Sequence, residues 1–350
     1  MPDNLEHENT NQNHVIDRAA QRLYEGGLVA FPTETVYGLG ADAENPAAIA
    51  KIYAAKQRPT GHPLIVHLAP EADIAYWTGR VSPRAQALID AFWPGPLTLI
   101  LPRAAHIPSA VSGGQPTIGL RCPSNPVAQA VLTRFAALKP GGHGGVAAPS
   151  ANKFGHVSPT RAEHVLSEFP EFDDAGLMVL DGGSSAVGIE STIVDLSDSA
   201  GGNGVPVLLR PGHILPEQIA QVLGVVPGRS HAGSPQVSGT LKAHYAPRTP
   251  LRLVRTDDLP GMADALAQGP DVRVGALVFR IPANRTEAGG VVDYYRCEQD
   301  AQAYAREIYG KLRDLDQKGY SVLLIEQPPE TSAWRAINDR LSRAAAAFQP

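Results

Sequence analysis

The stretch FPTETVYGLGAD, residues 31–42, follows a short apolar strand predicted at residues 28–31. A proline and then a run of hydrogen-bonding side chains come next: Thr33, Glu34, Thr35 and Tyr37. Two glycines follow and predict a turn. Ligands of open α/β sheets bind where strands end, so this stretch indicates a binding site. Hydroxyl groups in a turn also form hydrogen bonds with backbone groups. The stretch alone is therefore consistent with a binding site and with a turn that has only a structural role.

Short strands and helices alternate on both sides of this stretch, which predicts an α/β fold. The predicted strands of the first part cover residues 28–31, 63–68, 97–101, 117–121, 146–152, 177–180, 193–196 and 207–210, and the predicted helices cover 15–25, 46–58 and 83–92. Further on, the predicted strands cover residues 251–255, 274–279 and 320–325, and the predicted helices cover 257–267, 299–315 and 333–346. The regular alternation of this second part favours a small parallel sheet.

These patterns divide the chain into four segments. The polar residues 1–14 predict a disordered tail. Residues 15–226 form a first α/β domain, and residues 227–250, rich in Gly, Ser, Pro, His and Arg, form a linker or an ordered loop. Residues 251–350 form a smaller C-terminal domain.

The composition is that of a globular protein: of 350 residues, 43% are apolar and 19% are charged. The net charge of -5 gives no broad attraction for nucleic acid or an acidic membrane. Cys122 and Cys297 are too few for a disulfide framework or a zinc site, which favours a reducing compartment. We find no signal peptide and no apolar run near the ~20 residues that cross a bilayer. A cytoplasmic protein is therefore expected.

Common nucleotide and hydrolase fingerprints are missing, among them GxxxxGK[ST], GxGxxG after a strand, GxSxG and HExxH. Instead, small polar clusters recur at the ends of predicted strands, which suggests one site built from many segments. Beyond residues 33–37 they are Lys56 and Arg58, His67, Thr117 and Arg121, Ser150 and Asn152, Ser158, residues 190–192, and Arg210. Several cations and hydroxyl groups without an acid/base pair suit a polyphosphate and a carboxylate.

Each cluster also has a purely structural interpretation. Lys56 and Arg58 close a helix, where the dipole favours cations. His67 lies in an apolar strand, where a lone histidine is commonly a core residue, and Arg121 can pair with any carboxylate. Taken singly, none of these residues decides the function.

Taken together, the segments resemble a known family in wording and order. FPTETVYGLGAD, KIYAAKQRPTGHPLIVHL, FWPGPLTLIL, IGLRCP, APSANKFGHVSPT, GIESTIVDL and LLRPG resemble the YrdC-like domain of threonylcarbamoyl-AMP synthases. SGTLKAHYAPRTPL is similar to the linker of the long, two-domain form, and AINDRLSRA to its C-terminal helix. The resemblance implies a twisted mixed sheet with a concave substrate cleft, followed by a linker that acts as a lid and a small Rossmann-like domain.

The resemblance also implies a reaction. L-threonine, bicarbonate or CO2, and ATP with Mg2+ would give L-threonylcarbamoyladenylate and pyrophosphate. A partner transferase would then modify the tRNA adenosine next to the anticodon. Two alternatives remain open: an RNA-binding module without catalysis, and the carbamoyl-adenylate chemistry of hydrogenase maturation. The isolated cysteines speak against the second, because that protein carries paired CxxC motifs.

The family's site residues carry over to matching positions here. Around threonine the resemblance implies Thr33, His67, Arg121, Ala148 and Ser191. Around ATP it implies Lys56, Arg58, Thr117, Ser150, Asn152, Ser158, Arg210 and the linker residue Tyr245. Lys56 and Arg58 would be the catalytic cations, which neutralise charge on the leaving pyrophosphate. Glu34 and Glu190 are candidate Mg2+ ligands, and a metal held mainly by phosphates and water is equally consistent with the sequence.

Overall fold

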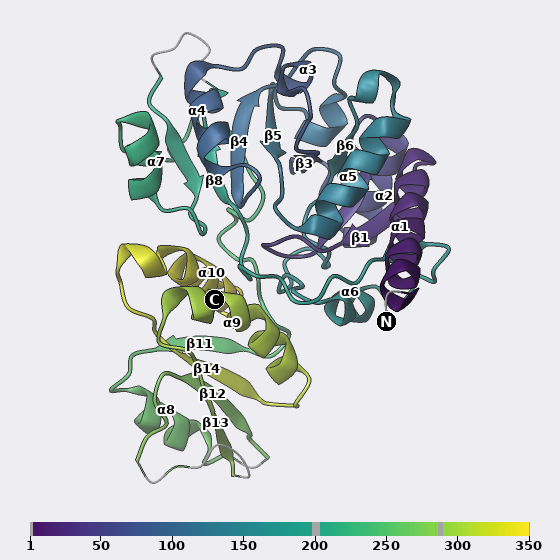
Figure 1. Ribbon diagram of the computed structural model, residues 1–350. Helices are drawn as coiled ribbons and strands as arrows, with labels where there is room; N and C mark the ends of the chain where they lie inside the picture. Colours follow the sequence, from purple (N-terminus) through teal and green to yellow (C-terminus); the bar gives the residue numbers. More distant parts are fainter. Residues whose placement is uncertain (1–2, 198–203, 270, 284, 286–289, 350) are drawn as a thin grey trace.

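The computed structural model describes residues 3–197, 204–269, 271–283, 285 and 290–349. They form two domains, one around a ten-stranded mixed sheet and one around a four-stranded parallel sheet (Figure 1). The predicted α/β class, with a mixed sheet followed by a smaller parallel one, is confirmed.

The large sheet has the strand order β10-β9-β8-β4-β5-β3-β6-β2-β1-β7. Its strands are β1 Leu28–Phe31, β2 Gly38–Asp42, β3 Ile65–Leu68, β4 Leu97–Pro102, β5 Thr117–Arg121, β6 Gly145–Ala147, β7 Leu177–Val179, β8 Thr192–Asp195, β9 Val207–Arg210 and β10 Gly228–Arg229. The helices around it are α1 Asp3–Tyr24, α2 Pro46–Lys56, α3 Ile74–Thr78, α4 Pro83–Phe92, α5 Pro126–Leu138, α6 Ala162–Glu168 and α7 Pro216–Leu223, with short 3-10 turns at Ser109–Ser112 and Pro140–Gly142.

Neighbouring strands of the large sheet run in both directions. β3 and β5 are parallel, with His67 opposite Arg121. β6 is antiparallel to β3, and β1 runs in the same direction as β6 because both are antiparallel to β2. β9 is antiparallel to β8, with Arg210 opposite Ile193. The segments that follow β1 and β6 therefore leave the sheet at one end of its strands. The segments that follow β5 and β9 leave it at the opposite end.

Two apolar clusters cover the two faces of the large sheet, as the period of two along a strand requires. Along β1, Leu28 and Ala30 join one cluster, while Val29 and Phe31 join the other. The second cluster lies under α1 and α5, which pack side by side on the sheet (Figure 1). The sheet is thus buried on both faces around the strands that carry the predicted site.

The glycines of FPTETVYGLGAD lie in strand β2, and the predicted turn at this place is wrong. Neither glycine has a positive φ. Gly40 faces a closely packed neighbourhood, where a Cβ atom would lie 2.7 Å from Phe31 Cε1 and 2.9 Å from Val146 Cγ1. Glycine is therefore needed here for close packing between neighbouring strands, which a turn signal in the sequence does not distinguish.

Gly40→Ala is expected to lower the free energy of unfolding by about 1–3 kcal/mol, because the added methyl group overpacks the space next to Phe31. Urea unfolding of the two proteins measures the difference. Gly61→Ala is the matched control, since nothing lies within 4 Å of a Cβ atom at Gly61. Equal stability of the Gly40 and Gly61 variants would contradict the packing argument.

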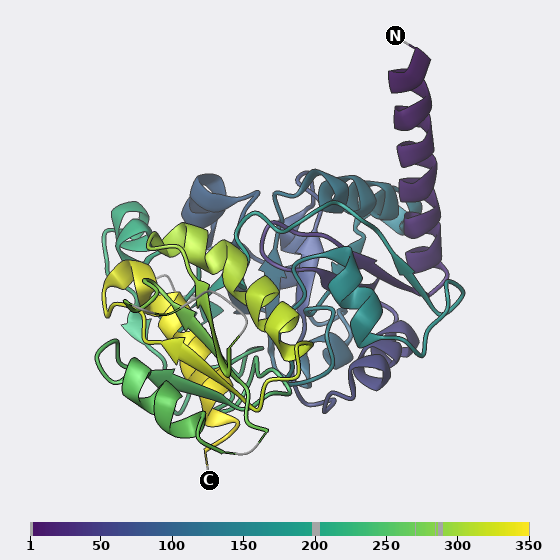
Figure 2. The same ribbon diagram turned by 90° about the horizontal axis from the view of Figure 1, so that it is seen from below.

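Residues 3–14, which the sequence assigns to a disordered tail, form the first part of α1. Met1 and Pro2 lie outside the described residues. The apolar stripe predicted for this helix is buried at Ile16, Ala19 and Leu23. Residues 3–24 contain no glycine or proline, so nothing in the sequence ends the helix before this stripe. Figure 2 shows the N-terminal part of α1 extending beyond the body of the molecule.

The linker, residues 227–250, is tied to both domains. It begins with β10, which pairs in parallel with β9 of the large sheet. Further along, the Ala246 amide donates to the Gly155 carbonyl at 2.9 Å. Asp316 of the C-terminal domain accepts hydrogen bonds from the amides of Arg248 and Thr249 at 3.0 and 2.7 Å. These contacts fix the path of the chain between the two domains.

The C-terminal domain has the strand order β11-β14-β12-β13, with all pairs parallel. Its elements are β11 Leu251–Val254, α8 Leu259–Leu266, β12 Val274–Val278, β13 Val292–Arg296, α9 Ala301–Asp316, β14 Val322–Glu326, a 3-10 turn at Ser332–Trp334, and α10 Arg335–Ala346. The sequence does not predict strand β13, because a charged residue interrupts its apolar pattern. Asp293 is nevertheless buried, and its carboxylate accepts a hydrogen bond from the Tyr320 hydroxyl at 2.7 Å.

Helices α9 and α10 face the large domain (Figure 1). One apolar cluster crosses the boundary, because Val36, Val157 and Ile189 of the large domain pack with Tyr309 of α9 and Ile337 of α10. Along the described ranges of the chain, no helix combines the length and the apolar character needed to span a bilayer.

Candidate active site

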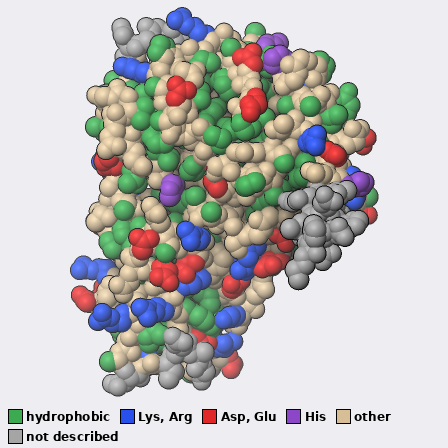
Figure 3. All heavy atoms as spheres, in the orientation of Figure 1, with side chains coloured by type: hydrophobic (Ala, Val, Ile, Leu, Met, Phe, Trp, Pro, Cys, Tyr) green, Lys and Arg blue, Asp and Glu red, His purple; other side chains and the backbone are tan. Residues whose placement is uncertain are grey.

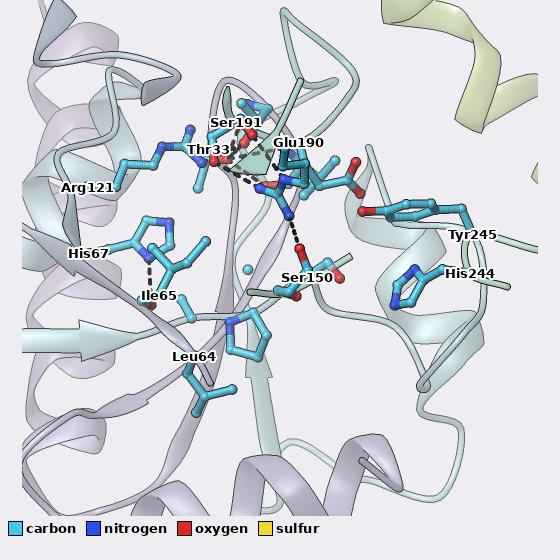
Figure 4. Close-up of a pocket in the computed structure, with 17 residues that line it drawn as sticks. Thr33, Leu64, Ile65, His67, Arg121, Ser150, Glu190, Ser191, His244 and Tyr245 are labelled. Atoms are coloured by element: carbon cyan, nitrogen blue, oxygen red, sulfur yellow. Dashed lines mark hydrogen bonds between the residues drawn. The ribbon is translucent and has the colours of Figure 1, made fainter. Parts of the chain in front are cut away.

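A polar cavity lies between the large sheet and the linker. In Figure 4, Arg121 and His67 lie on one side of it and His244 and Tyr245 on the other. It is lined by Thr33, Thr35, Val36 and Gly38, by Leu64, Ile65 and His67 at β3, by Arg121, by residues 148–150, by Glu190 and Ser191, by Arg210, and by Ser238, His244 and Tyr245 of the linker.

The residues after β1 form a turn that is held by its own hydroxyl groups. Thr33 Oγ1 donates to the Val36 carbonyl at 2.6 Å and accepts from the amides of Thr35 and Val36, both at 3.2 Å. Thr35 Oγ1 lies 2.9 Å from Thr33 Oγ1. The structural interpretation of FPTET therefore holds, and the same turn places Thr33 and Thr35 in the cavity wall.

Arg121 is fixed in the cavity wall by a buried ion pair. Its Nη2 lies 2.6 Å from Glu34 Oε1, and its Nη1 donates to Thr35 Oγ1 at 2.9 Å. The other carboxylate oxygen, Glu34 Oε2, accepts a hydrogen bond from the Ser124 amide at 3.1 Å. Since both partners come from segments distant in sequence, this pair joins the turn after β1 to the end of β5.

His67 is a buried, neutral histidine beside Arg121. Its Nδ1 lies 3.3 Å from the Ile65 carbonyl. Burial, and secondly the charge of Arg121, lower the pKa of His67 to about 3. The imidazole therefore remains uncharged near neutral pH and serves as a hydrogen-bonding group rather than as a cation.

Arg210, at the end of β9, is held by the segment before β8. Its Nε and Nη2 donate to the carbonyl and the hydroxyl of Ser191 at 3.1 and 3.0 Å, and its Nη1 donates to the Ser238 carbonyl at 2.9 Å. Ser191 Oγ also lies 2.8 Å from Thr98 Oγ1. Ser191 and Arg210 thus enter the cavity as one rigid unit, and Ser238 attaches the linker to it.

Lys56 lies outside the cavity wall, where it holds a loop. Its ammonium donates to the Ser150 carbonyl at 2.6 Å and also to the Asn152 carbonyl. Burial, with Arg58 nearby, lowers the pKa of Lys56 well below its usual value. Lys56 therefore supports the segment that carries Ser150 into the cavity.

Arg58 turns away from Lys56 because Gln57 between them ends α2 in the left-handed conformation, with φ 52°. The Arg58 guanidinium donates to the Pro63 carbonyl at 3.0 Å and to Ser238 Oγ at 3.5 Å, and burial lowers its pKa to about 10. Its Nε is buried without a hydrogen-bond partner. Arg58 thus reaches the edge of the cavity through Ser238 and keeps one donor unused.

Besides Lys56 and Arg58, three more predicted residues lie away from the cavity wall. Thr117 is at the other end of β5, on the same face of the strand as Arg121. The Asn152 amide group donates to the carbonyls of Lys153 and His156, at 2.7 and 3.0 Å. Ser158 is buried and donates to Glu190 Oε1 at 2.6 Å.

Both candidate metal ligands are occupied by other partners. Glu34 is paired with Arg121, and Glu190 accepts hydrogen bonds at both oxygens. Burial alone would raise the pKa of Glu190, but Arg340 and Arg210 lower it to about 2, so it is ionised. Within the described residues no group of three or more His, Cys, Asp or Glu side chains could hold a metal ion. The donor set does not fit a metal bound by the protein alone.

Three buried histidines make the fold sensitive to acid. Burial is the main reason that the pKa values of His67, His164 and His244 fall to about 3, from 6.5. The unfolded chain binds these protons below pH 6.5 and the folded chain only near pH 3, so the free energy of unfolding should decrease as pH falls from 6.5 towards 3. Each histidine contributes a slope of at most about 1.4 kcal/mol per pH unit.

Urea unfolding between pH 7.5 and about 5.5 measures this slope before Glu168 and Glu190, whose pKa values folding lowers from 4.5 to about 2, begin to contribute. His164→Gln, away from the cavity, should reduce the slope because it removes one of the protons that the unfolded chain takes up; His62 and His213, whose pKa values burial also lowers, contribute to the remaining slope. A stability that does not change over this range would contradict the assignment.

The structure brings together all five residues predicted around threonine: Thr33, His67, Arg121, Ala148 and Ser191. Of those predicted around ATP, Ser150, Arg210 and Tyr245 line the cavity, while Lys56, Arg58, Thr117, Asn152 and Ser158 do not. Ser238 and His244 of the linker also line the cavity, and neither was predicted from the sequence. His244 directly precedes Tyr245 in HYAP, and that motif could have indicated it.

The fold and this cavity define an α/β protein with a cavity at the large sheet that buried arginines line. The family model described as "Telomere recombination" matches residues 21–212, and the model described as "Threonylcarbamoyl-AMP synthase, C-terminal domain" matches residues 214–346. The chain therefore belongs to the threonylcarbamoyl-AMP synthase family, in its long two-domain form. The boundary between the two matches falls before α7, although α7 packs against the large domain.

The relatives cover both domains. A threonylcarbamoyl-AMP synthase from Bacillus subtilis is 38% identical, over 94% of this chain and 92% of the relative. One from Pyrococcus abyssi is 34% identical, over 93% and 92%. The crystal structure of P. abyssi Sua5 complexed with L-threonine is similar, with a TM-score of 0.80, 31% identity and coverage of 95% and 94%.

Proposed function

We propose that this chain is a nucleotidyltransferase that condenses L-threonine, bicarbonate or CO2, and ATP into L-threonylcarbamoyladenylate and pyrophosphate. The observation that carries the proposal is the polar cavity, in which the residues matching the family's threonine positions converge. The similarity to a Sua5 structure complexed with L-threonine, over almost the full chain, supports it.

Threonine would bind at the side of the cavity formed by Arg121 and His67. A guanidinium suits the amino-acid carboxylate, and Arg121 is already fixed by Glu34 and Thr35. A neutral His67 can exchange a hydrogen bond with the substrate without adding charge. The amine would then face the centre of the cavity, where it takes up CO2 to form a carbamate.

ATP would bind between Ser150, Arg210 and the linker residue Tyr245. Arg210 and Arg58 supply positive charge for the phosphates, and Lys56 acts by holding the loop that carries Ser150. A carbamate oxygen attacks the α-phosphorus, the bond to pyrophosphate breaks, and pyrophosphate leaves. Positioning and charge stabilisation supply most of the rate in such a reaction, so no covalent intermediate with the protein is needed.

Mg2+ would enter with ATP, held by the phosphates and water. Glu34 and Glu190 are engaged with arginines, and neither is left free as a ligand. A hydrated Mg2+ that keeps most of its ligands from phosphate and water is common in nucleotide sites.

The product would serve tRNA modification in the cytoplasm, where a transferase complex moves the threonylcarbamoyl group to the adenosine next to the anticodon. Free, buried cysteines at 122 and 297 are compatible with that compartment. The two alternatives, an RNA-binding module and hydrogenase maturation, are not favoured. On the face seen in Figure 3, acidic and basic side chains are interspersed over the C-terminal domain, as expected for a solvated surface.

Pyrophosphate release from ATP tests the proposal. Purified protein is assayed with bicarbonate and Mg2+, with L-threonine, with L-serine and without an amino acid. We expect release that requires L-threonine, together with a product of the mass of threonylcarbamoyladenylate. If folded protein releases pyrophosphate equally without threonine, or not at all while tRNA binds in a salt-dependent manner, the synthase proposal fails.

A further inference from the structure

We propose that Arg340, in helix α10 of the C-terminal domain, is a positioning residue for the nucleotide side of the cavity. It neutralises Glu190 and supports Tyr245, so that Arg210 stays available for an anionic substrate. The inference rests on the proposed function, because it assigns ATP as that substrate. Arg340 lies outside the cavity wall and acts through residues that line it.

The first contact of Arg340 is with the carboxylate of Glu190. Arg340 Nε lies 2.7 Å from Glu190 Oε2, and the Tyr309 hydroxyl of α9 donates to the same oxygen at 2.9 Å. On the other side, Ser158 donates to Oε1 at 2.6 Å. Glu190 therefore receives three hydrogen bonds, and the two to Oε2 come from the C-terminal domain.

The second contact of Arg340 is with the linker. Its guanidinium lies 5.2 Å from the centre of the Tyr245 ring, within the range of a cation–π interaction. Tyr309 stacks on the same ring, with the ring centres 6.0 Å apart. Arg340 Nη2 also donates to the Pro211 carbonyl, next to Arg210, at 3.0 Å. One side chain thus joins three segments that form the nucleotide side of the cavity.

The burial of Arg340 is the reason to assign it more than a packing role. Only 1% of it is exposed; Tyr245 and Tyr309 beside it belong to an apolar cluster between the domains, and its Nη1 pairs with Asp339 Oδ2 at 2.6 Å. Apolar residues of similar size would join two domains at no electrostatic cost, so a buried arginine here calls for another explanation.

The explanation is that Glu190 and the phosphates of the substrate would otherwise compete for Arg210. Both Glu190 and Arg210 line the cavity, and Arg210 is the second arginine, besides Arg340, whose charge acts on the Glu190 carboxylate. Without Arg340, this carboxylate would be left to pair with Arg210. A carboxylate that pairs with Arg210 would repel the phosphates that Arg210 should bind. Arg340 therefore keeps Glu190 Oε2 paired with α10 and leaves Arg210 to the phosphates.

Four variants of the full chain test the inference: Arg340→Met, Arg340→Lys, Arg313→Met and the double variant Arg340→Met/Glu190→Gln. Arg313 is the matched control, because it is a second buried arginine of the C-terminal domain and pairs with Glu168 of the large domain at 3.1 Å. Binding of ATP with Mg2+ is measured by equilibrium dialysis, and pyrophosphate release gives separate KM values for ATP and L-threonine.

We expect Arg340→Met to weaken ATP binding ~10-fold or more, with the KM for threonine changed less than threefold, and Arg313→Met to change neither by more than threefold. The double variant should recover most of the lost ATP affinity, because glutamine no longer competes for Arg210. Arg340→Lys should lie between, since an ammonium keeps the charge but not the fork of donors.

A purely structural role predicts equal losses in Arg340→Met and Arg313→Met, and no recovery in the double variant, and either result overturns the inference. Arg340→Lys covers the case in which Arg340→Met does not fold, because it keeps the charge and loses the fork of donors that reaches the Pro211 carbonyl; ATP affinity equal to that of wild type there would overturn the inference too. If wild type binds ATP but releases no pyrophosphate with threonine, the proposed reaction fails while the dialysis still decides the role of Arg340.

Discussion

Arg121→Met is expected to lower threonine-dependent pyrophosphate release by ~10²-fold or more, because it removes the cation proposed to bind the threonine carboxylate. It also leaves the buried side chain of Glu34 without its ion-pair partner, which should destabilise the fold by about 3–5 kcal/mol. Activity is therefore compared at a temperature where each variant is shown to be folded by circular dichroism.

The double variant Arg121→Met/Glu34→Gln separates these two effects. It removes the unpaired carboxylate, so stability should return close to that of wild type. Activity should remain low, and a higher threonine concentration should restore part of it, because the loss lies in threonine binding. Full activity in the stable double variant would show that Arg121 has only a structural role.

Lys56→Met is expected to reduce pyrophosphate release by ~10²-fold as well, for a different reason. The carbonyls of Ser150 and Asn152 would lose their shared donor, and each buried carbonyl left unpaired costs about 1–3 kcal/mol. The loop 148–152 would then shift, and Ser150 would no longer be held in the cavity. We expect the free energy of unfolding and the activity to fall together.

Lys153→Met is the control for Lys56, since it removes a lysine of the adjoining segment whose partners are the Ala55 carbonyl and Glu171. Its activity should stay within a few fold of wild type. If Lys56→Met lost activity with its stability unchanged, Lys56 would contact ATP directly and the loop-holding role would be wrong. Unfolding curves recorded beside the kinetic measurements decide between these outcomes.

The sequence predicts most of this architecture from its apolar periods. Strands such as β1 and β5 lie where the pattern places them, because their side chains are apolar and buried. The sequence predicts a turn at residues 38–42, where the structure has strand β2. A sequence does not distinguish a glycine that close packing requires from a glycine that a turn requires. The sequence does not predict strand β13, because its second residue, Asp293, finds a partner only in the folded domain.

The candidate site is predictable as a set of residues but not as a geometry. Lys56 and Arg121 both stand out as cations near strand or helix ends, yet only Arg121 enters the cavity wall. What separates them is which carbonyl or carboxylate each meets, and those partners come from segments about 90 positions away. Arg340 lies further still from Glu190, and nothing local in AINDRLSRA indicates that contact.

The wide spacing of these partners has a consequence for biosynthesis. A nascent chain emerges from the ribosome at about 5–20 residues per second, N-terminal part first. Strand β1 pairs with β7, so one border of the large sheet is incomplete until residue 179 has emerged. Arg340 of α10, which forms the ion pair with Glu190, is synthesised later still. Ribosome-bound chains that end before α10 should therefore carry a formed sheet and an unfinished nucleotide pocket, so synthase activity would appear only late in translation.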